Sequence, residues 1–82
     1  MEKAVMVVDD SEPIRKFLIF ALRSIGISVV AARDGMDALE KLSHNKVDLV
    51  ITDLNMPNMD GFEFLKALRE DNEYYEVPVI IL

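Results

Sequence analysis

The sequence predicts an α/β fold built on a parallel sheet, with the element order βαβαβαβ. Four short apolar runs recur along the 82 residues, and stretches with helix-like spacing lie between them. The runs are continuous rather than alternating, which suits strands that are covered on both faces and are therefore parallel. Strands and helices that alternate in this way form consecutive right-handed βαβ units. The length permits one small domain, residues 1–82.

The first two strands are expected at residues 4–8 and 28–32, which are apolar and rich in valine. The helix between them has a favourable start and exit: Ser11 suits the N-cap, Pro13 the first turn and Gly26 the exit. The apolar residues of this helix recur at the spacing of one helix face. They are Ile14, Phe17, Leu18, Ala21, Leu22 and Ile25.

The second half of the chain repeats the alternation. A second helix carries Met36, Leu39 and Leu42 on one face, with Asp34 as its candidate cap, and a third strand is expected at residues 47–52. A third helix starts at Asp60 or Gly61, carries Phe62, Leu65 and Leu68, and is broken by Asp71-Asn72. The fourth strand covers residues 77–82 and has Pro78 near its beginning.

The composition excludes several classes of protein. Apolar residues make up 51% of the chain, so it is not disordered, and without cysteine it has no disulfide or thiolate metal site. The net charge of −6 argues against a nucleic-acid-binding face. The apolar run at 4–8 is too short for a signal peptide or a membrane span. We expect a soluble, cytoplasmic protein.

Three aspartates occupy the most informative positions. Asp9 and Asp10 directly follow the first strand, and Asp53 directly follows the third. Ligands of open α/β sheets bind beyond the carboxyl ends of the strands, so these side chains are expected to converge. Carboxylates that lie close together repel unless a cation intervenes. Hard oxygen ligands favour Mg²⁺ or Mn²⁺, and a backbone carbonyl after Asp53, such as that of Asn55, completes the set.

The same cluster suits phosphoryl transfer to a carboxylate. An aspartate can act as a nucleophile and form an aspartyl phosphate, while a metal ion neutralises the transferring oxygens. Asp53 is the preferred acceptor because it ends a central strand and precedes a loop that can wrap the phosphate. Asp9 and Asp10 then hold the metal.

Three other interpretations stay open. The pair Asp9-Asp10 can be a solvated turn. The chain can be a Mg²⁺-dependent phosphohydrolase with its nucleophile after the first strand, although such enzymes carry D-x-D where this chain has adjacent aspartates followed by Ser11. It can also be a natural or engineered fold fragment that acts only in assembly. Outside the cluster, His44 is expected at the surface, and Met56 and Met59 are expected to make packing contacts.

Residues 7–11, 33–39 and 50–61 together resemble the receiver domain of two-component response regulators. The acidic pair after the first strand and the run D-x-x-M-P-x-M-D-G from Asp53 to Gly61 carry the resemblance, which extends along the whole chain. It implies a flavodoxin-like doubly wound sheet with strand order 2-1-3-4-5. It also implies a phosphoacceptor module that is not an enzyme beyond its own phosphotransfer.

The resemblance also implies roles for individual residues. Asp53 would be phosphorylated by a phosphohistidine on a histidine kinase or phosphotransfer protein. Mg²⁺ would be held by Asp10, Asp53 and the main-chain oxygen of Asn55, with Asp9 acting through a bound water.

The family also carries a Ser or Thr after the fourth strand and a Lys after the fifth, whereas the printed chain ends at Leu82. We therefore expect an incomplete sheet of order 2-1-3-4 that lacks the fifth strand and the last two helices. The phosphorylation switch should be impaired. The exposed apolar edge of the last strand should promote self-association, as a homodimer or a larger assembly.

Overall fold

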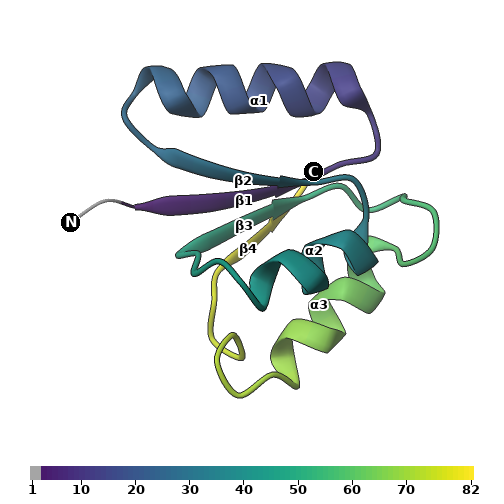
Figure 1. Cartoon of the computed structure of the whole chain (residues 1–82). Coiled ribbons are helices and arrows are strands. Elements are labelled where there is room, and N and C mark those ends of the chain that lie inside the picture. The colour runs from purple at the N-terminus through teal and green to yellow at the C-terminus, as the bar shows by residue number, and fades with distance from the viewer. Residues whose placement is uncertain (1–2) are drawn as a thin grey trace.

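A computed structural model describes residues 3–82. Four parallel strands form one sheet in the order β2-β1-β3-β4, with α1 on one side and α2 and α3 on the other (Figure 1). This is the predicted α/β architecture of flavodoxin-like type, with the predicted strand order. The strands are β1 (Ala4–Val8), β2 (Ser28–Ala32), β3 (Leu49–Thr52) and β4 (Val79–Ile81), and the helices are α1 (Glu12–Ser24), α2 (Gly35–Leu42) and α3 (Gly61–Arg69).

The chain reverses its direction of winding at β1, which is where the site forms. From β1 it crosses over α1 to β2 on one flank, and it then returns over α2 to β3 on the other flank. The carboxyl ends of β1 and β3 therefore lie side by side at a topological switch point, the place where ligands of such sheets bind. None of the helices formed by residues 3–82 has the length and apolar character needed to cross a membrane.

The predicted helix caps are confirmed. The Ser11 hydroxyl accepts from the backbone N–H of Ile14 at 3.4 Å at the start of α1. Asp34 caps α2. Asp60 and Glu63 form a reciprocal capping box at the start of α3, with backbone-to-side-chain distances of 2.9 and 3.1 Å. Each helix start therefore has donors satisfied by a residue that the sequence singled out.

The hydrophobic core lies between the sheet and the α2 and α3 layer. Alternate residues of the strands point into it, and the largest fully buried side chain of the described chain is Phe64 of α3. Met56 and Met59 pack against it, as the sequence predicted. The core is formed by Met6, Val8, Ala32, Ala38, Leu42, Val47, Val50, Phe64, Leu68, Tyr74 and Val77.

The turn before β4 is anchored in this core by Tyr74. Its side chain is buried, and its hydroxyl lies 2.9 Å from the carbonyl oxygen of Asn45 and 3.3 Å from that of Leu42. Burial raises the pKa of the Tyr74 phenol, and the negative charge of Glu73 adds to the rise. The phenol therefore stays protonated and ties the segment before β4 to the end of α2.

The opposite side of the sheet departs from the expectation that every strand is covered on both faces. Ile80 of β4, which points to the α1 side, is 47% exposed. The predicted apolar face of α1 is also only half used: Leu18, Ala21 and Leu22 are half-buried, whereas Phe17 is 68% exposed. The reason is geometric, because one helix cannot cover four strands. α1 contacts β1 and β2 and leaves the β3 and β4 side open.

Two predicted strands are shorter in the structure. β3 begins at Leu49 rather than at residue 47, because Asp48 is held by other bonds: its N–H donates to the Ala4 carbonyl and its carboxylate accepts from the Ala4 N–H. β4 begins after Pro78, which has no N–H to donate but accepts from the N–H of Val50 at 3.0 Å.

Candidate functional site

The predicted convergence of the three aspartates is confirmed. Asp9, Asp10 and Asp53 each offer a carboxylate oxygen, and these oxygens lie within 4.8 Å of one another. The strand register causes this: Val8 pairs with Thr52, so the next residue on each strand reaches the same edge of the sheet. The Asp53 N–H donates to the Val8 carbonyl at 2.8 Å, and the Asp9 N–H donates to the Ala32 carbonyl at 3.1 Å. Both acidic residues are thus fixed by the sheet itself.

The three carboxylates differ in exposure and in hydrogen bonding. Asp9 is 4% exposed and accepts from the N–H of Ser11 at 2.8 Å, whereas Asp10 is exposed. Asp53 is half-buried, and one of its oxygens accepts from its neighbour's N–H, that of Leu54, at 2.8 Å. Within residues 3–82, no protein donor reaches the other oxygen of Asp9 or Asp53. The cluster therefore combines two oriented carboxylates with a solvent-facing one, a donor set that fits a hard divalent cation.

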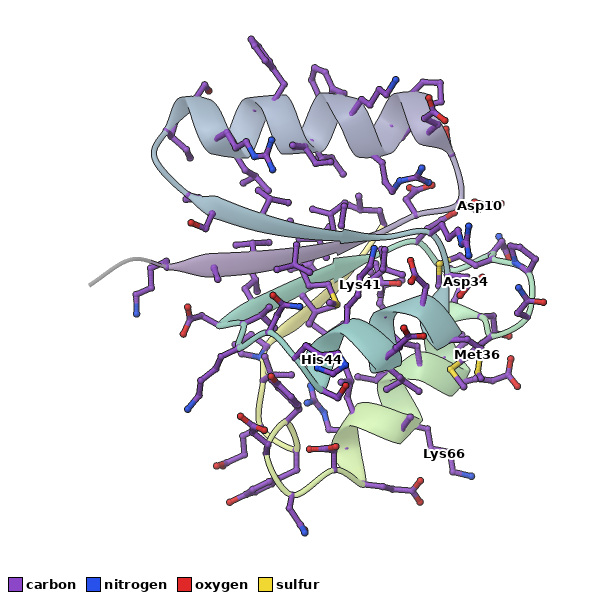
Figure 2. All side chains as sticks on the ribbon, in the orientation of Figure 1. Asp10, Asp34, Met36, Lys41, His44 and Lys66 are labelled. Atoms are coloured by element: carbon purple, nitrogen blue, oxygen red, sulfur yellow. The ribbon has the colours of Figure 1, made fainter. Side chains whose placement is uncertain are left out.

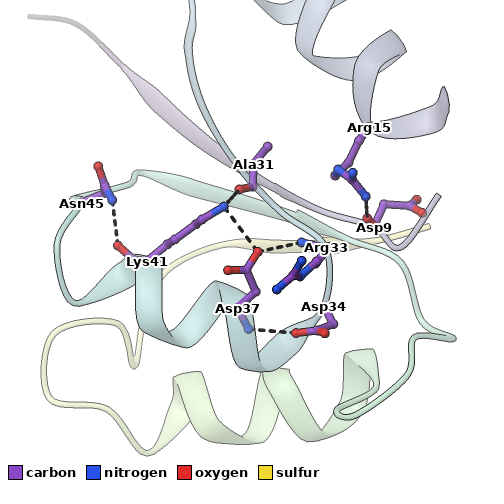
Figure 3. Close-up of polar contacts among 8 residues, drawn as sticks. All are labelled: Asp9, Arg15, Ala31, Arg33, Asp34, Asp37, Lys41 and Asn45. Carbon is purple, nitrogen blue, oxygen red and sulfur yellow. Dashed lines mark hydrogen bonds and ion pairs between the residues drawn. The ribbon is translucent and has the colours of Figure 1, made fainter. Parts of the chain in front are cut away.

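Positive side chains line an open hollow beside the cluster, and sequence reasoning missed them. The Arg15 guanidinium donates to the main-chain oxygen of Asp9 at 2.7 Å (Figure 3). Lys41 donates to the Ala31 carbonyl at 2.6 Å and pairs with Asp37 at 3.3 Å. With Arg33, these side chains surround a space of about 360 Å³. The carboxylate of Asp37 lines the same space, so three positive side chains and one negative side chain surround it.

The loop after Asp53 is anchored at its far end by Gly61. A Cβ atom at this position would lie 2.6 Å from the Asp53 carbonyl oxygen, so only glycine lets α3 start this close to the acceptor backbone. The Gly61 N–H also donates to the Leu54 carbonyl at 2.8 Å. The start of α3 therefore rests against the residue that precedes the loop.

Two further residues that the sequence analysis named have exposed side chains. The side chain of Asn55 is exposed in the loop, and His44 is exposed at the end of α2 remote from Asp10 (Figure 2). A contact that the sequence did not predict joins this loop to α2: the Asn58 amide donates to Asp34 at 2.9 Å. The backbone N–H of Asp37 and this amide hold the pKa of Asp34 below its ordinary range, because both bonds stabilise the carboxylate.

An acidic cluster at the switch point of a flavodoxin-like sheet is the arrangement that the resemblance to receiver domains implied. Residues 5–82 match the response regulator receiver domain family. The chain belongs to this family, as its motifs indicated, and its general role is that of a regulatory phosphoacceptor module in two-component signalling.

Individual relatives agree with this assignment. The chemotaxis response regulator CheY4 of Vibrio cholerae is 40% identical and superposes with a TM-score of 0.94 over 99% of this chain and 68% of its own. The CAI-1 autoinducer sensor kinase/phosphatase CqsS of Vibrio cholerae is 38% identical over 96% of this chain, and the sensor protein EvgS of Escherichia coli is 46% identical over 84%. The chain spans only 12% and 6% of the lengths of these two sensor proteins.

Proposed function

We propose that Asp53 is the phosphoacceptor of this module and takes its phosphoryl group from a phosphohistidine. The convergence of Asp9, Asp10 and Asp53 carries the proposal. The Leu54 N–H orients one Asp53 oxygen, which leaves the other free to attack phosphorus. The new bond joins this oxygen to phosphorus, the phosphorus–nitrogen bond of the donor breaks, and the imidazole leaves with the electron pair.

The carboxylates around Asp53 fit a magnesium site, and Mn²⁺ would serve in its place. Asp10, Asp53 and the main-chain oxygen of Asn55 would hold the ion, and Asp9 would act through a water molecule. When bound, the ion supplies positive charge to the transferring phosphoryl oxygens. Asp9 suits the indirect role because it is buried and its side chain is already tied to Ser11.

The partner that we propose is a histidine kinase or a histidine phosphotransfer protein, and we place the exchange in the cytoplasm. The similarity to segments of two sensor proteins supports this pairing. Arg15, Arg33 and Lys41 would reduce the repulsion between the donor phosphate and the carboxylates. Within residues 3–82, however, no lysine or arginine forms an ion pair with the three aspartates. The phosphoryl group on this 82-residue chain should therefore be short-lived.

Phosphorylation from a small donor tests the proposal. The protein is incubated with phosphoramidate and Mg²⁺ and analysed by intact-mass spectrometry. During incubation, a fraction of the wild type and of Glu70→Gln, an exposed carboxylate at the end of α3, should carry one added phosphoryl group, and none is expected in Asp53→Asn. Phosphorylation that persists in Asp53→Asn would disprove the assignment. Turnover of a phosphate ester that requires Asp9 but not Asp53 would indicate a phosphohydrolase instead.

We also propose that the 82-residue chain self-associates through the open side of its sheet. Phe17 and Phe20 of α1 are 68% and 73% exposed, and Ile80 and Leu82 add apolar surface at β4. Exposed apolar surface of this kind is a site of association. Light scattering after size exclusion should give more than a monomer mass at tens of micromolar. A monomer at every concentration would refute this proposal without affecting the phosphoacceptor assignment.

A further inference from the structure

We propose that Asn58 and Asp34 are positioning residues that clamp the loop between β3 and α3 onto the start of α2, and so hold the main-chain oxygen of Asn55 where a cation can use it. The inference rests on the proposed function, because it concerns the loop that would supply a main-chain ligand to the proposed cation. Asn58 and Asp34 themselves would act only by positioning that loop. The clamp joins positions 24 residues apart in the chain.

Asp34 is built to serve two elements at once. It is 6% exposed, and each of its oxygens accepts one hydrogen bond. Oδ1 accepts from the Asp37 N–H at 2.8 Å and caps α2, whereas Oδ2 accepts from the Asn58 amide at 2.9 Å. A residue needed only as a cap would use one oxygen. The second oxygen is committed to the loop.

Asn58 holds the loop in a conformation that the backbone alone disfavours. Its φ of 69° is in the left-handed region, and it is the only non-glycine residue with positive φ in the described chain. The Met59 N–H donates to the Pro57 carbonyl at 2.7 Å, which closes a three-residue turn around Asn58. The γ-turn with positive φ is the rare and strained form. Such strain persists where tertiary contacts enforce it, and it marks functional loops.

The neighbouring residue strengthens the same attachment. Met59 packs so closely on the start of α2 that a Cβ atom at Gly35 would lie 2.7 Å from its Cγ. Asn58 and Met59 therefore fasten one end of the loop to α2, and the bond from Gly61 to Leu54 fastens the other end to α3. Asn55 lies between these two attachments. Releasing the first one lets the strained turn relax and frees the Asn55 carbonyl to move.

Magnesium affinity, measured by calorimetry, tests the clamp in three variants. Asn58→Gly tolerates positive φ but removes the amide, and Asn58→Asp places a second carboxylate against Asp34. Both should weaken Mg²⁺ binding by roughly 10-fold, the size of effect seen when partners that orient metal ligands are removed. The double variant Asp34→Asn/Asn58→Asp exchanges the amide and the carboxylate, and it should recover most of the affinity. Val47→Ala, a buried change at the opposite end of the sheet, should destabilise the fold without altering the affinity.

A second readout does not depend on the metal. Amide hydrogen exchange and ¹⁵N relaxation at Asn55 and Met56 should show a more mobile loop in Asn58→Gly than in the wild type, and a restored loop in the exchanged pair. Unchanged affinity in the single variants, or no recovery in the double variant, would overturn the clamp. If the wild type binds no Mg²⁺, the proposed metal site is wrong. The clamp is then tested by the exchange and relaxation data alone, and a loop as rigid in Asn58→Gly as in the wild type would reject it.

Discussion

The two sides of the sheet use similar helices in opposite ways. On one side, α2 and α3 bury Ala38, Leu42, Phe64 and Leu68. Phe64 and Leu68 are fully inaccessible to solvent. On the other side α1, the longest helix of the described chain, has no buried residue. Amphipathic patterning therefore shows which residues can be buried, but the area of sheet available to each helix decides which of them are.

The packed side also carries the elements that shape the site. The loop after Asp53 is attached to α2 through Asp34 and to α3 through Gly61. α1 contributes Arg15 near the cluster, but it contributes no attachment of the loop. Changes at the starts of α2 and α3, which hold the loop, should therefore disturb the site, whereas changes on the exposed face of α1 should leave it unaltered.

The largest difference between the two sides should come from matched phenylalanine truncations. Phe64→Ala removes a fully buried ring and should lower the free energy of unfolding by about 3–5 kcal/mol. Phe17→Ala removes a ring that is 68% exposed and should change it by no more than about 0.5 kcal/mol. Urea denaturation followed by circular dichroism measures both. Equal losses would show that the α1 side is packed as well as the other.

An added methyl group at Gly61 should damage the fold and the site together. Gly61→Ala forces α3 away from the Asp53 carbonyl, because the new atom would lie 2.6 Å from it, and should cost about 1–3 kcal/mol. Phosphorylation by phosphoramidate should slow in the fraction that remains folded. Gly26→Ala is the control for strain alone, since its φ is 85° but no atom lies within 4 Å of the added Cβ. It should leave the rate of phosphorylation unchanged.

Removing the Asp34 carboxylate should give a smaller loss that depends on pH. Asp34→Ala deletes a helix cap and should cost about 1 kcal/mol at neutral pH. The folded-state pKa is depressed by the bonds from Asp37 and Asn58, with a further contribution from Arg33. The stabilisation by the Asp34 carboxylate is therefore complete above its unfolded-state pKa, and it is lost as the pH falls through the lower pKa of the folded state. Stability curves of wild type and variant should converge there. A constant gap at acid pH would assign the loss to packing.

The smallest change in stability is expected on the exposed face of α1. Phe17→Ser and Phe20→Ser should alter the free energy of unfolding by no more than about 0.5 kcal/mol, because both rings face solvent. They should nevertheless lower the apparent mass of the 82-residue chain in light scattering, since apolar surface is removed. A large loss of stability at a concentration where the chain is monomeric would mean that the rings are packed within the chain itself.

The chain pattern predicts the fold and the acidic cluster because both follow from local rules. Apolar runs locate the strands, caps such as Asp60 locate the helices, and two parallel strands that each end in aspartate bring Asp9 and Asp53 to one edge. The apolar face predicted for α3 is partly wrong, because Phe62 is 63% exposed whereas Phe64 is buried. Two further features that the sequence did not predict have a common cause. The exposure of Phe17 depends on the area of neighbouring sheet, and the bond between Asn58 and Asp34 depends on the path of a loop. The spacing of residues along the sequence predicts neither of these features.

The strands differ in how many neighbours they pair with, and this difference predicts the order in which their backbone hydrogen bonds should open locally. β1 is bonded on both flanks along its length, whereas β4 is joined to β3 by three residue pairs and faces solvent at Ile80 and Ile81. Local openings follow such differences in pairing and cover. Amide protons of β4 should exchange first and those of β1 last. β3, which Asp53 directly follows, thus lies between the most protected and the least protected strands, and fraying of β4 should reach Asp53 before it reaches Asp9.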